Sequence, residues 1–119
     1  MSDLSNEEVY RAVGAIVRQY SLFGCADCAK AVLKWLRANG IPGTVLKLRT
    51  RFRESHILST RKLNEGFGDS ITDNGVHYGV EVRGLVFDNL SSEGMTREQW
   101  LLDFSCPSQQ FSLQELDRL

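Results

Sequence analysis

The chain has little net charge, since 14 lysines and arginines stand against 15 aspartates and glutamates. A net charge of -1 excludes the overall basicity that would make nucleic acid the default partner, so none is expected. A run of about 18 apolar residues is also lacking, so no membrane-spanning helix and no membrane partner are expected. The first residues lack the basic and apolar regions of a signal peptide, and we expect a protein that is cytoplasmic as synthesised.

Cysteine and histidine are scarce, with three and two residues respectively. An odd number of cysteines argues against a closed disulfide framework and favours thiols that are reactive, metal-bound or simply buried. With 119 residues and 42% hydrophobic content, the chain has the size of one domain. No internal repeat, low-complexity tract or linker divides it, so we expect a single domain over residues 1–119.

The hydrophobic pattern predicts an α+β protein in which a small antiparallel sheet follows two helices. The helices are expected at about residues 6–20, 25–39 and 96–104, and the sheet at about residues 44–90. Capping boxes at Ser5 and Thr96 mark the starts of the first and last of these helices. A further capping pattern over residues 112–115 predicts a final helical turn.

The most strongly patterned helix begins at a short glycine-cysteine turn. Cys25 lies in its first turn, beside unpaired backbone N–H groups and the positive end of the helix dipole, and both favour the thiolate. Cys25 and Cys28 fall on one apolar stripe, so both are expected to face inward. Cys25 is the preferred nucleophile because Gly24 opens the backbone to approach and Cys28 lies deeper in the stripe, but Cys28 remains the alternative.

Two alternating segments, residues 77–82 and 85–89, are joined by a two-residue turn and predict a β-hairpin. The pairing places His77 and Asp88 on the same face as diagonal neighbours, with open space expected between them at Gly79. An imidazole and a carboxylate on one strand pair, together with a cysteine at a helix start, are the parts of a Cys-His-Asp nucleophilic site.

Several motifs point in the same direction. Residues 24–29 read G-C-x-x-C-A and residues 36–43 read L-R-x-x-G-I-P-G. This resembles the signature of transglutaminase-like cysteine enzymes, in which one residue separates the glycine from the cysteine while the later spacings are the same. The segment H-Y-G-V-E-V at residues 77–82 is similar to the H-x-W-x-E-V of that family, and Asp88 follows on the next strand.

More narrowly, F-x-C-x-x-C-A, N-G-x-H, F-D-N and G-M-T-R-E-Q-W, spread over about residues 15–110, resemble the papain-fold toxin domains of bacterial polymorphic toxin systems. The resemblance implies a papain-like fold, in which the helix with the cysteine packs against the sheet with the histidine and aspartate. It makes Cys25 the nucleophile, His77 the general base and acid, and Asp88 the orienting residue. Gln19 has the spacing of an oxyanion-hole glutamine, and papain-type C-G-S-C-W strings use the later cysteine, which would be Cys28.

The same resemblance implies a bacterial toxin or effector that modifies a protein in a target or competitor cell. An immunity protein in the producing cell would be its partner. Peptide cleavage, glutamine deamidation and transglutamination share the acyl-enzyme step, and the sequence does not encode which nucleophile resolves it. No cofactor and no metal are expected for this chemistry.

Two other interpretations use the cysteine pair differently. A Cys-x-x-Cys at a helix start resembles a thioredoxin-type redox motif, although that motif follows a hydrophobic strand and here an amphipathic helix precedes it. Paired cysteines are also ordinary zinc ligands, and Cys25, Cys28 and Cys106 with His77 or His56 could complete a site in a non-catalytic interaction module. A second closely spaced ligand pair is lacking in the sequence.

Overall fold

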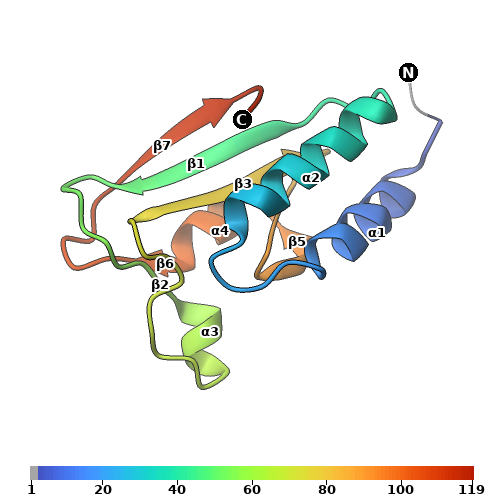
Figure 1. Cartoon of the computed structure of the whole chain (residues 1–119). Coiled ribbons are helices and arrows are strands. Elements are labelled where there is room, and N and C mark those ends of the chain that lie inside the picture. The colour runs from blue at the N-terminus through green and yellow to red at the C-terminus, as the bar shows by residue number, and fades with distance from the viewer. Residues whose placement is uncertain (1–2) are drawn as a thin grey trace.

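A computed structural model describes residues 3–119, so the first two residues of the expected domain 1–119 lie outside the described part (Figure 1). The described chain contains four helices, a five-stranded sheet and a separate two-stranded sheet. The helices are α1 (Asn6–Val17), α2 (Cys25–Ala38), α3 (Thr60–Asn64) and α4 (Arg97–Leu102). The strands are β1 (Thr44–Thr50), β2 (Leu58–Ser59), β3 (Val76–Val82), β4 (Leu85–Asp88), β5 (Ser91–Met95), β6 (Phe104–Ser105) and β7 (Phe111–Leu116).

The main sheet is antiparallel throughout and has the order β5-β4-β3-β1-β7, while β2 pairs with β6. Figure 1 shows α2 in front of the sheet and α4 behind it. Because side chains alternate along a strand, β3 contributes to a core on each face. Val80 and Val82 pack with α1 and α2, whereas His77 and Gly79 lie on the face covered by Trp100 of α4.

Local sequence signals set several of the element boundaries. Both capping boxes form: Ser5 exchanges hydrogen bonds with Glu8 before α1, and Thr96 does so with Gln99 before α4. The two-residue turn between β3 and β4 is also confirmed, with Arg83 and its glycine neighbour both at positive φ, 48° and 88°. A two-residue turn with both central residues at positive φ matches the right-handed twist of the two strands, and it sets the register of the hairpin.

The expectations for the ends of the sheet need correction. The sheet continues beyond residue 90 into β5 and takes a further strand, β7, after α4. The final helical turn expected over residues 112–115 is wrong, because these residues lie in β7 and pair with β1, Ser112 opposite Arg49. The free edge of β1 supplies backbone partners that a short terminal helix would lack.

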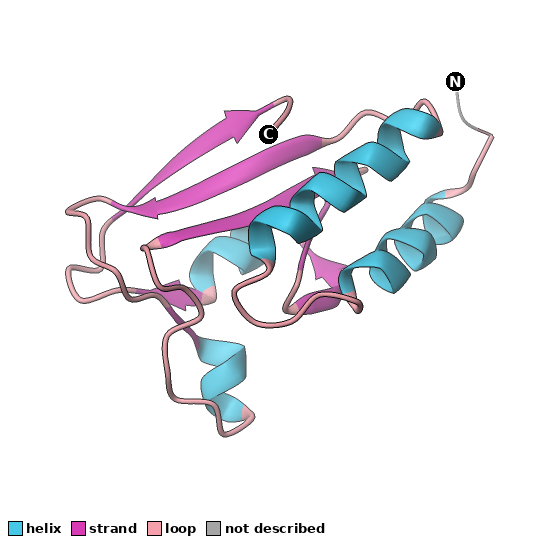
Figure 2. Cartoon of the chain, in the orientation of Figure 1, coloured by secondary structure: helices cyan, strands magenta, loops and turns pink. Residues whose placement is uncertain are grey.

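Loops gather at the end of the sheet where β3 begins, which is also the end at which α2 starts (Figure 2). The fold therefore brings the start of the cysteine helix, the start of β3 and two long loops together. Within residues 3–119, even the longest helix, α2 with 14 residues, falls short of the length and apolar character needed to cross a membrane.

Candidate active site

The candidate active site starts at the N-terminus of α2. Gly24 is the N-cap residue, and the Cys28 N–H donates to the Gly24 carbonyl over 2.9 Å. The N–H groups of residues 25–27 therefore have no partner in the preceding helical turn, and they face outward with the positive end of the helix dipole. Cys25 is the first helical residue, is 8% exposed, and places its Sγ 4.0 Å from the Val76 carbonyl oxygen at the start of β3.

His77 and Asp88 form the buried half of the site. The Nε2 atom of His77 lies 2.8 Å from Oδ2 of Asp88, and both side chains are almost fully buried. The predicted hairpin register accounts for this contact, because Val80 pairs with Phe87 and so brings the two residues to the same face. The second ring nitrogen, Nδ1, is buried without a conventional hydrogen bond within residues 3–119, which leaves it for the Cys25 thiol.

Cys25 and His77 each shift the pKa of the other toward its charged form. Burial by itself raises the pKa of Cys25, but hydrogen bonding to His77 and its charge outweigh burial and hold this pKa below its ordinary value. The backbone N–H groups of Tyr78 and Ala26 act in the same direction. Burial lowers the pKa of His77, but Asp88 and Cys25 raise it to about 9. Each group thus favours the charged form of the other, a thiolate beside an imidazolium, and the thiolate is the nucleophilic form.

Asp88 is oriented by three donors. Its Oδ2 accepts from Nε2 of His77 and, also at 2.8 Å, from Nε1 of Trp100, while its Oδ1 accepts from the Leu90 N–H at 2.9 Å. Burial raises the pKa of Asp88, but these bonds from His77 and Trp100, the charge of His77 and that of Arg61 bring it below its ordinary value. The carboxylate is therefore ionised and held in one orientation.

The open space expected beside Gly79 does not exist, because Trp100 fills it. A Cβ at Gly79 would lie 3.0 Å from the Trp100 ring on one side and 2.9 Å from Cγ1 of Val86. The indole and the His77 ring are stacked at a centroid distance of 5.9 Å, and Phe104 approaches the imidazole to 5.0 Å from another side. These rings shield the His77–Asp88 pair from water. The sequence pattern predicts no role in the site for Trp100. The features that could have indicated one are its place in the capped helix and in the G-M-T-R-E-Q-W motif.

The structure separates the remaining candidates from this group. Cys28 is 1% exposed in the core between the helices and the sheet. Burial, followed by the nearby charges of Asp88 and Cys25, raises the pKa of Cys28 to about 12, so its thiol is protonated at neutral pH. Gln19 is exposed beyond the end of α1, and its Nε2 donates to the Ala15 carbonyl at 3.4 Å. The fold thus brings Cys25 and the His77–Asp88 pair together and leaves Gln19 outside.

The sequence matches the family model described as papain fold toxin 2 over residues 8–105. The chain belongs to the papain fold toxin 2 family. The match covers most of the chain and includes Cys25, His77 and Asp88. No curated protein and no solved structure matches the chain. Membership assigns this protein to the papain fold toxins, with the α+β papain-like fold, and suggests a cysteine enzyme.

The side chains expected as zinc ligands do not come together in the described part of this papain fold toxin. Cys106 lies beyond β6 with its Sγ 3.4 Å from the Gln110 carbonyl oxygen, and His56 is exposed with its Nδ1 beside the Ser55 hydroxyl. Among residues 3–119, no three histidine, cysteine, aspartate or glutamate side chains are placed to hold a metal ion. The redox motif also lacks its context, because α1 and a loop precede Cys25 where a thioredoxin-type site has a strand.

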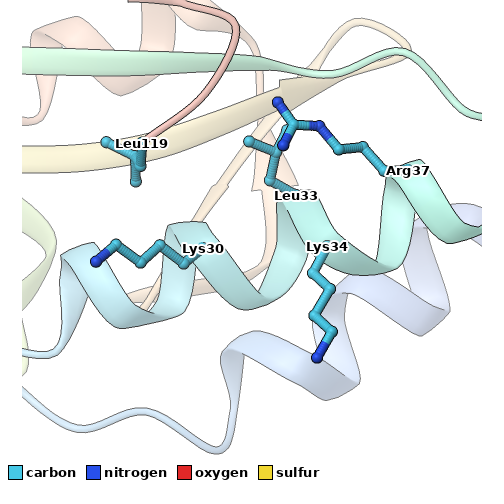
Figure 3. Close-up of a pocket in the computed structure, with 5 residues that line it drawn as sticks. All are labelled: Lys30, Leu33, Lys34, Arg37 and Leu119. Atoms are coloured by element: carbon cyan, nitrogen blue, oxygen red, sulfur yellow. The ribbon is translucent and has the colours of Figure 1, made fainter.

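Two hollows of the surface lie along α2. A small cavity of about 90 Å³ opens beside Cys25. Another of about 250 Å³ lies further along the helix and contains none of the three candidate catalytic residues. Its lining is Lys30, Leu33, Lys34, Arg37 and Leu119. Figure 3 shows the Lys34 side chain pointing away from Leu119, so the cations of this second hollow are spread along the helix instead of converging on one point.

Proposed function

We propose that this papain fold toxin is a cysteine-dependent acyl-transfer enzyme that acts on a protein substrate through Cys25, His77 and Asp88. The observation that carries the proposal is the buried pair in which His77 Nε2 lies 2.8 Å from Asp88 Oδ2, while the same ring lowers the pKa of Cys25. Family membership supports a toxin, and the site supports the chemistry that a papain-like fold would perform.

In the first half of the reaction the Cys25 thiolate attacks a carbonyl carbon of the substrate and forms a C–S bond. The electron pair of the carbonyl moves to its oxygen, which becomes an oxyanion. The tetrahedral intermediate then collapses to a thioester, and the amine leaves with the proton that His77 donates from Nδ1. Asp88 keeps Nε2 protonated and stabilises the imidazolium, so that Nδ1 is the nitrogen that exchanges the proton.

In the second half a nucleophile resolves the thioester. The Nδ1 atom of His77 removes a proton from water or from a lysine amine, which attacks the carbonyl, and Cys25 leaves as the thiolate. Water acting on a peptide gives cleavage, water acting on a glutamine side chain gives deamidation, and a lysine amine gives transglutamination. All three outcomes use the same residues of this chain.

The oxyanion needs hydrogen-bond donors, and the start of α2 supplies them. The N–H groups of residues 25–27 have no partner in the preceding helical turn and flank the reactive sulfur. The predicted role of Gln19 would require its side chain to leave the Ala15 carbonyl and turn toward Cys25. We therefore assign the oxyanion to the backbone donors and retain Gln19 as a secondary donor.

Expression in bacteria tests the proposal directly. We expect growth arrest by the wild-type chain, loss of arrest in Cys25→Ser, and retention in the control Glu93→Gln, which alters an exposed side chain on β5 away from the site. Mass spectrometry of host proteins then distinguishes cleavage from a deamidation shift of about one dalton. If Cys25→Ser remained as harmful as the wild type, the enzymatic proposal would be wrong.

We also propose, as the resemblance to bacterial polymorphic toxin systems implies, a partner in the form of an immunity protein that protects the producing cell. Co-expression of the gene adjacent to the toxin gene should restore growth and give a complex that co-purifies with the Cys25→Ser variant. Absence of both effects for the adjacent gene would count against this partner without affecting the site chemistry.

A further inference from the structure

The small cavity at Cys25 has two neighbouring cavities that share lining residues with it or with each other. It shares Phe23, Thr72 and Asp73 with a second cavity of about 490 Å³. The second cavity shares His56, Asp69 and Ser70 with a third of about 360 Å³, which reaches Pro107. We call these three neighbouring cavities the Cys25 groove. Only the smallest of the three cavities contains Cys25, so a substrate that occupies all of them would extend away from the thiol.

One wall of the groove is an exposed aromatic residue held in an uncommon backbone conformation. Phe23 is 56% exposed and has φ of 68°, the left-handed region that is costly for a bulky residue. It stands two residues before Cys25 and lines both of the first two cavities. An apolar ring kept at the surface beside a reactive thiol is suited to contact an apolar side chain of a substrate.

Another part of the lining is a loop whose shape is fixed by its own hydrogen bonds. The Ser70 hydroxyl donates to the Thr72 carbonyl at 2.5 Å and accepts from the Ile57 N–H at 3.1 Å. The Asn74 side chain accepts from the Thr72 hydroxyl at 2.8 Å and from the N–H of Val76 at 3.1 Å. These bonds hold the intervening residue, Asp73, in place between the first two cavities, so its position does not depend on a bound substrate.

The charge of the groove is negative. Asp73 and Asp69 are exposed, and neither forms an ion pair with a lysine or arginine within residues 3–119. No lysine or arginine lines any of the three cavities, and His56 is the one basic residue there. Carboxylates without a cationic partner attract a cationic side chain and repel the phosphates of nucleic acid or lipid.

We propose that the Cys25 groove binds an extended segment of a protein substrate that carries a lysine or arginine close to the reacting carbonyl. Asp73 is the specificity-determining residue for this cation, because it lines both the cavity of the thiol and the larger cavity next to it. Phe23 contacts an apolar side chain of the same segment, and Asp69 extends the negative wall. This inference rests on the proposed function, since it names the substrate class of the same thiol.

Peptidyl acyloxymethyl ketones that differ in one residue, arginine, glutamine or glutamate next to the ketone, test the groove. The Cys25 thiolate displaces the carboxylate leaving group and forms a thioether, which intact-mass spectrometry follows as a rate. We expect the arginine probe to react about five times faster than the glutamine probe with the wild type at low salt. Asp73→Asn should remove the preference, and Asp73→Lys should reverse it toward glutamate.

The matched control is Glu93→Gln, which removes one exposed carboxylate on β5 that lines none of the three cavities and should leave the preference unchanged. Iodoacetamide, which needs no groove, separates the two possible failures. Rapid alkylation of Cys25 with equal rates for all three probes would overturn the groove alone. Slow alkylation of Cys25, no faster than that of Cys106, would overturn the proposed function as well.

Discussion

Replacement of Asp88 by asparagine is the perturbation that best isolates the His77–Asp88 pair. The carboxylate accepts from His77 and Trp100 at Oδ2 and from the Leu90 N–H at Oδ1. Asparagine has the same shape but only one acceptor oxygen, so in either orientation its NH₂ group faces a buried donor. Leaving one buried donor without an acceptor costs about 1–3 kcal/mol of folding free energy.

The substitution also removes the charge that keeps His77 protonated. The pKa of His77 is 6.5 in the unfolded chain and about 9 in the folded protein. Below pH 6.5 this difference contributes about 3 kcal/mol to the free energy of unfolding, and the contribution is lost as the pH increases through about 9. Without Asp88 the burial of His77 lowers its pKa, and Cys25 loses the imidazolium beside it. Burial then raises the pKa of Cys25, whereas even a thiol of ordinary pKa near 8.5 is ionised to only about one part in 300 at pH 6. Alkylation at pH 6 should therefore slow by more than about tenfold.

The assay is the rate of iodoacetamide alkylation of Cys25 between pH 5 and 9, read by mass spectrometry, with urea unfolding in parallel. We expect the rates of wild type and Asp88→Asn to approach each other only as the pH rises toward 9, because burial raises the pKa of the variant's thiol. Asp103→Asn is the matched control, because Asp103 is also buried and accepts from Ser59 and Arg61 but not from His77. It should lose stability and keep the wild-type pH profile. An unchanged profile in Asp88→Asn would refute the reasoning about the pair.

Three further substitutions test the surroundings of the site. Trp100→Phe keeps a ring but removes the bond to Asp88, so the urea midpoint should fall by the equivalent of about 1–2 kcal/mol, and an unchanged midpoint would contradict this. Gly79→Ala places a methyl group 3.0 Å from the Trp100 ring, so the free energy of unfolding should fall by about 1–3 kcal/mol, as measured by thermal unfolding. Equal stability of the variant and the wild type would show that the ring can move. Cys28→Ala should cost about 1 kcal/mol and leave the alkylation rate of Cys25 within about twofold; a large decrease would favour Cys28 as the nucleophile.

Local rules were sufficient for the helix starts and for the hairpin. The capping boxes and the turn at Arg83-Gly84 depend on neighbouring residues, and period-two alternation then sets which side chains share a face. For this reason the contact between His77 and Asp88 was predictable, and the structure confirms it at 2.8 Å. The helix-start position of Cys25 followed in the same way from the glycine-cysteine turn and the apolar stripe.

The tertiary structure decided what fills the space around those residues. Trp100 comes from α4, later in the chain, and occupies the gap expected at Gly79. Protein interiors are close-packed, so a side chain from another element fills such a space. The strand β7 forms because β1 offers a free edge with unpaired backbone groups. This pairing is long-range, so the local sequence of residues 111–116 does not predict it. The contrast between the thiols of Cys25 and Cys28 also depends on burial and on charges from other strands. The sequence by itself therefore determined the candidate groups and the contact between His77 and Asp88, whereas long-range packing brought Cys25 to this pair and determined the charge states.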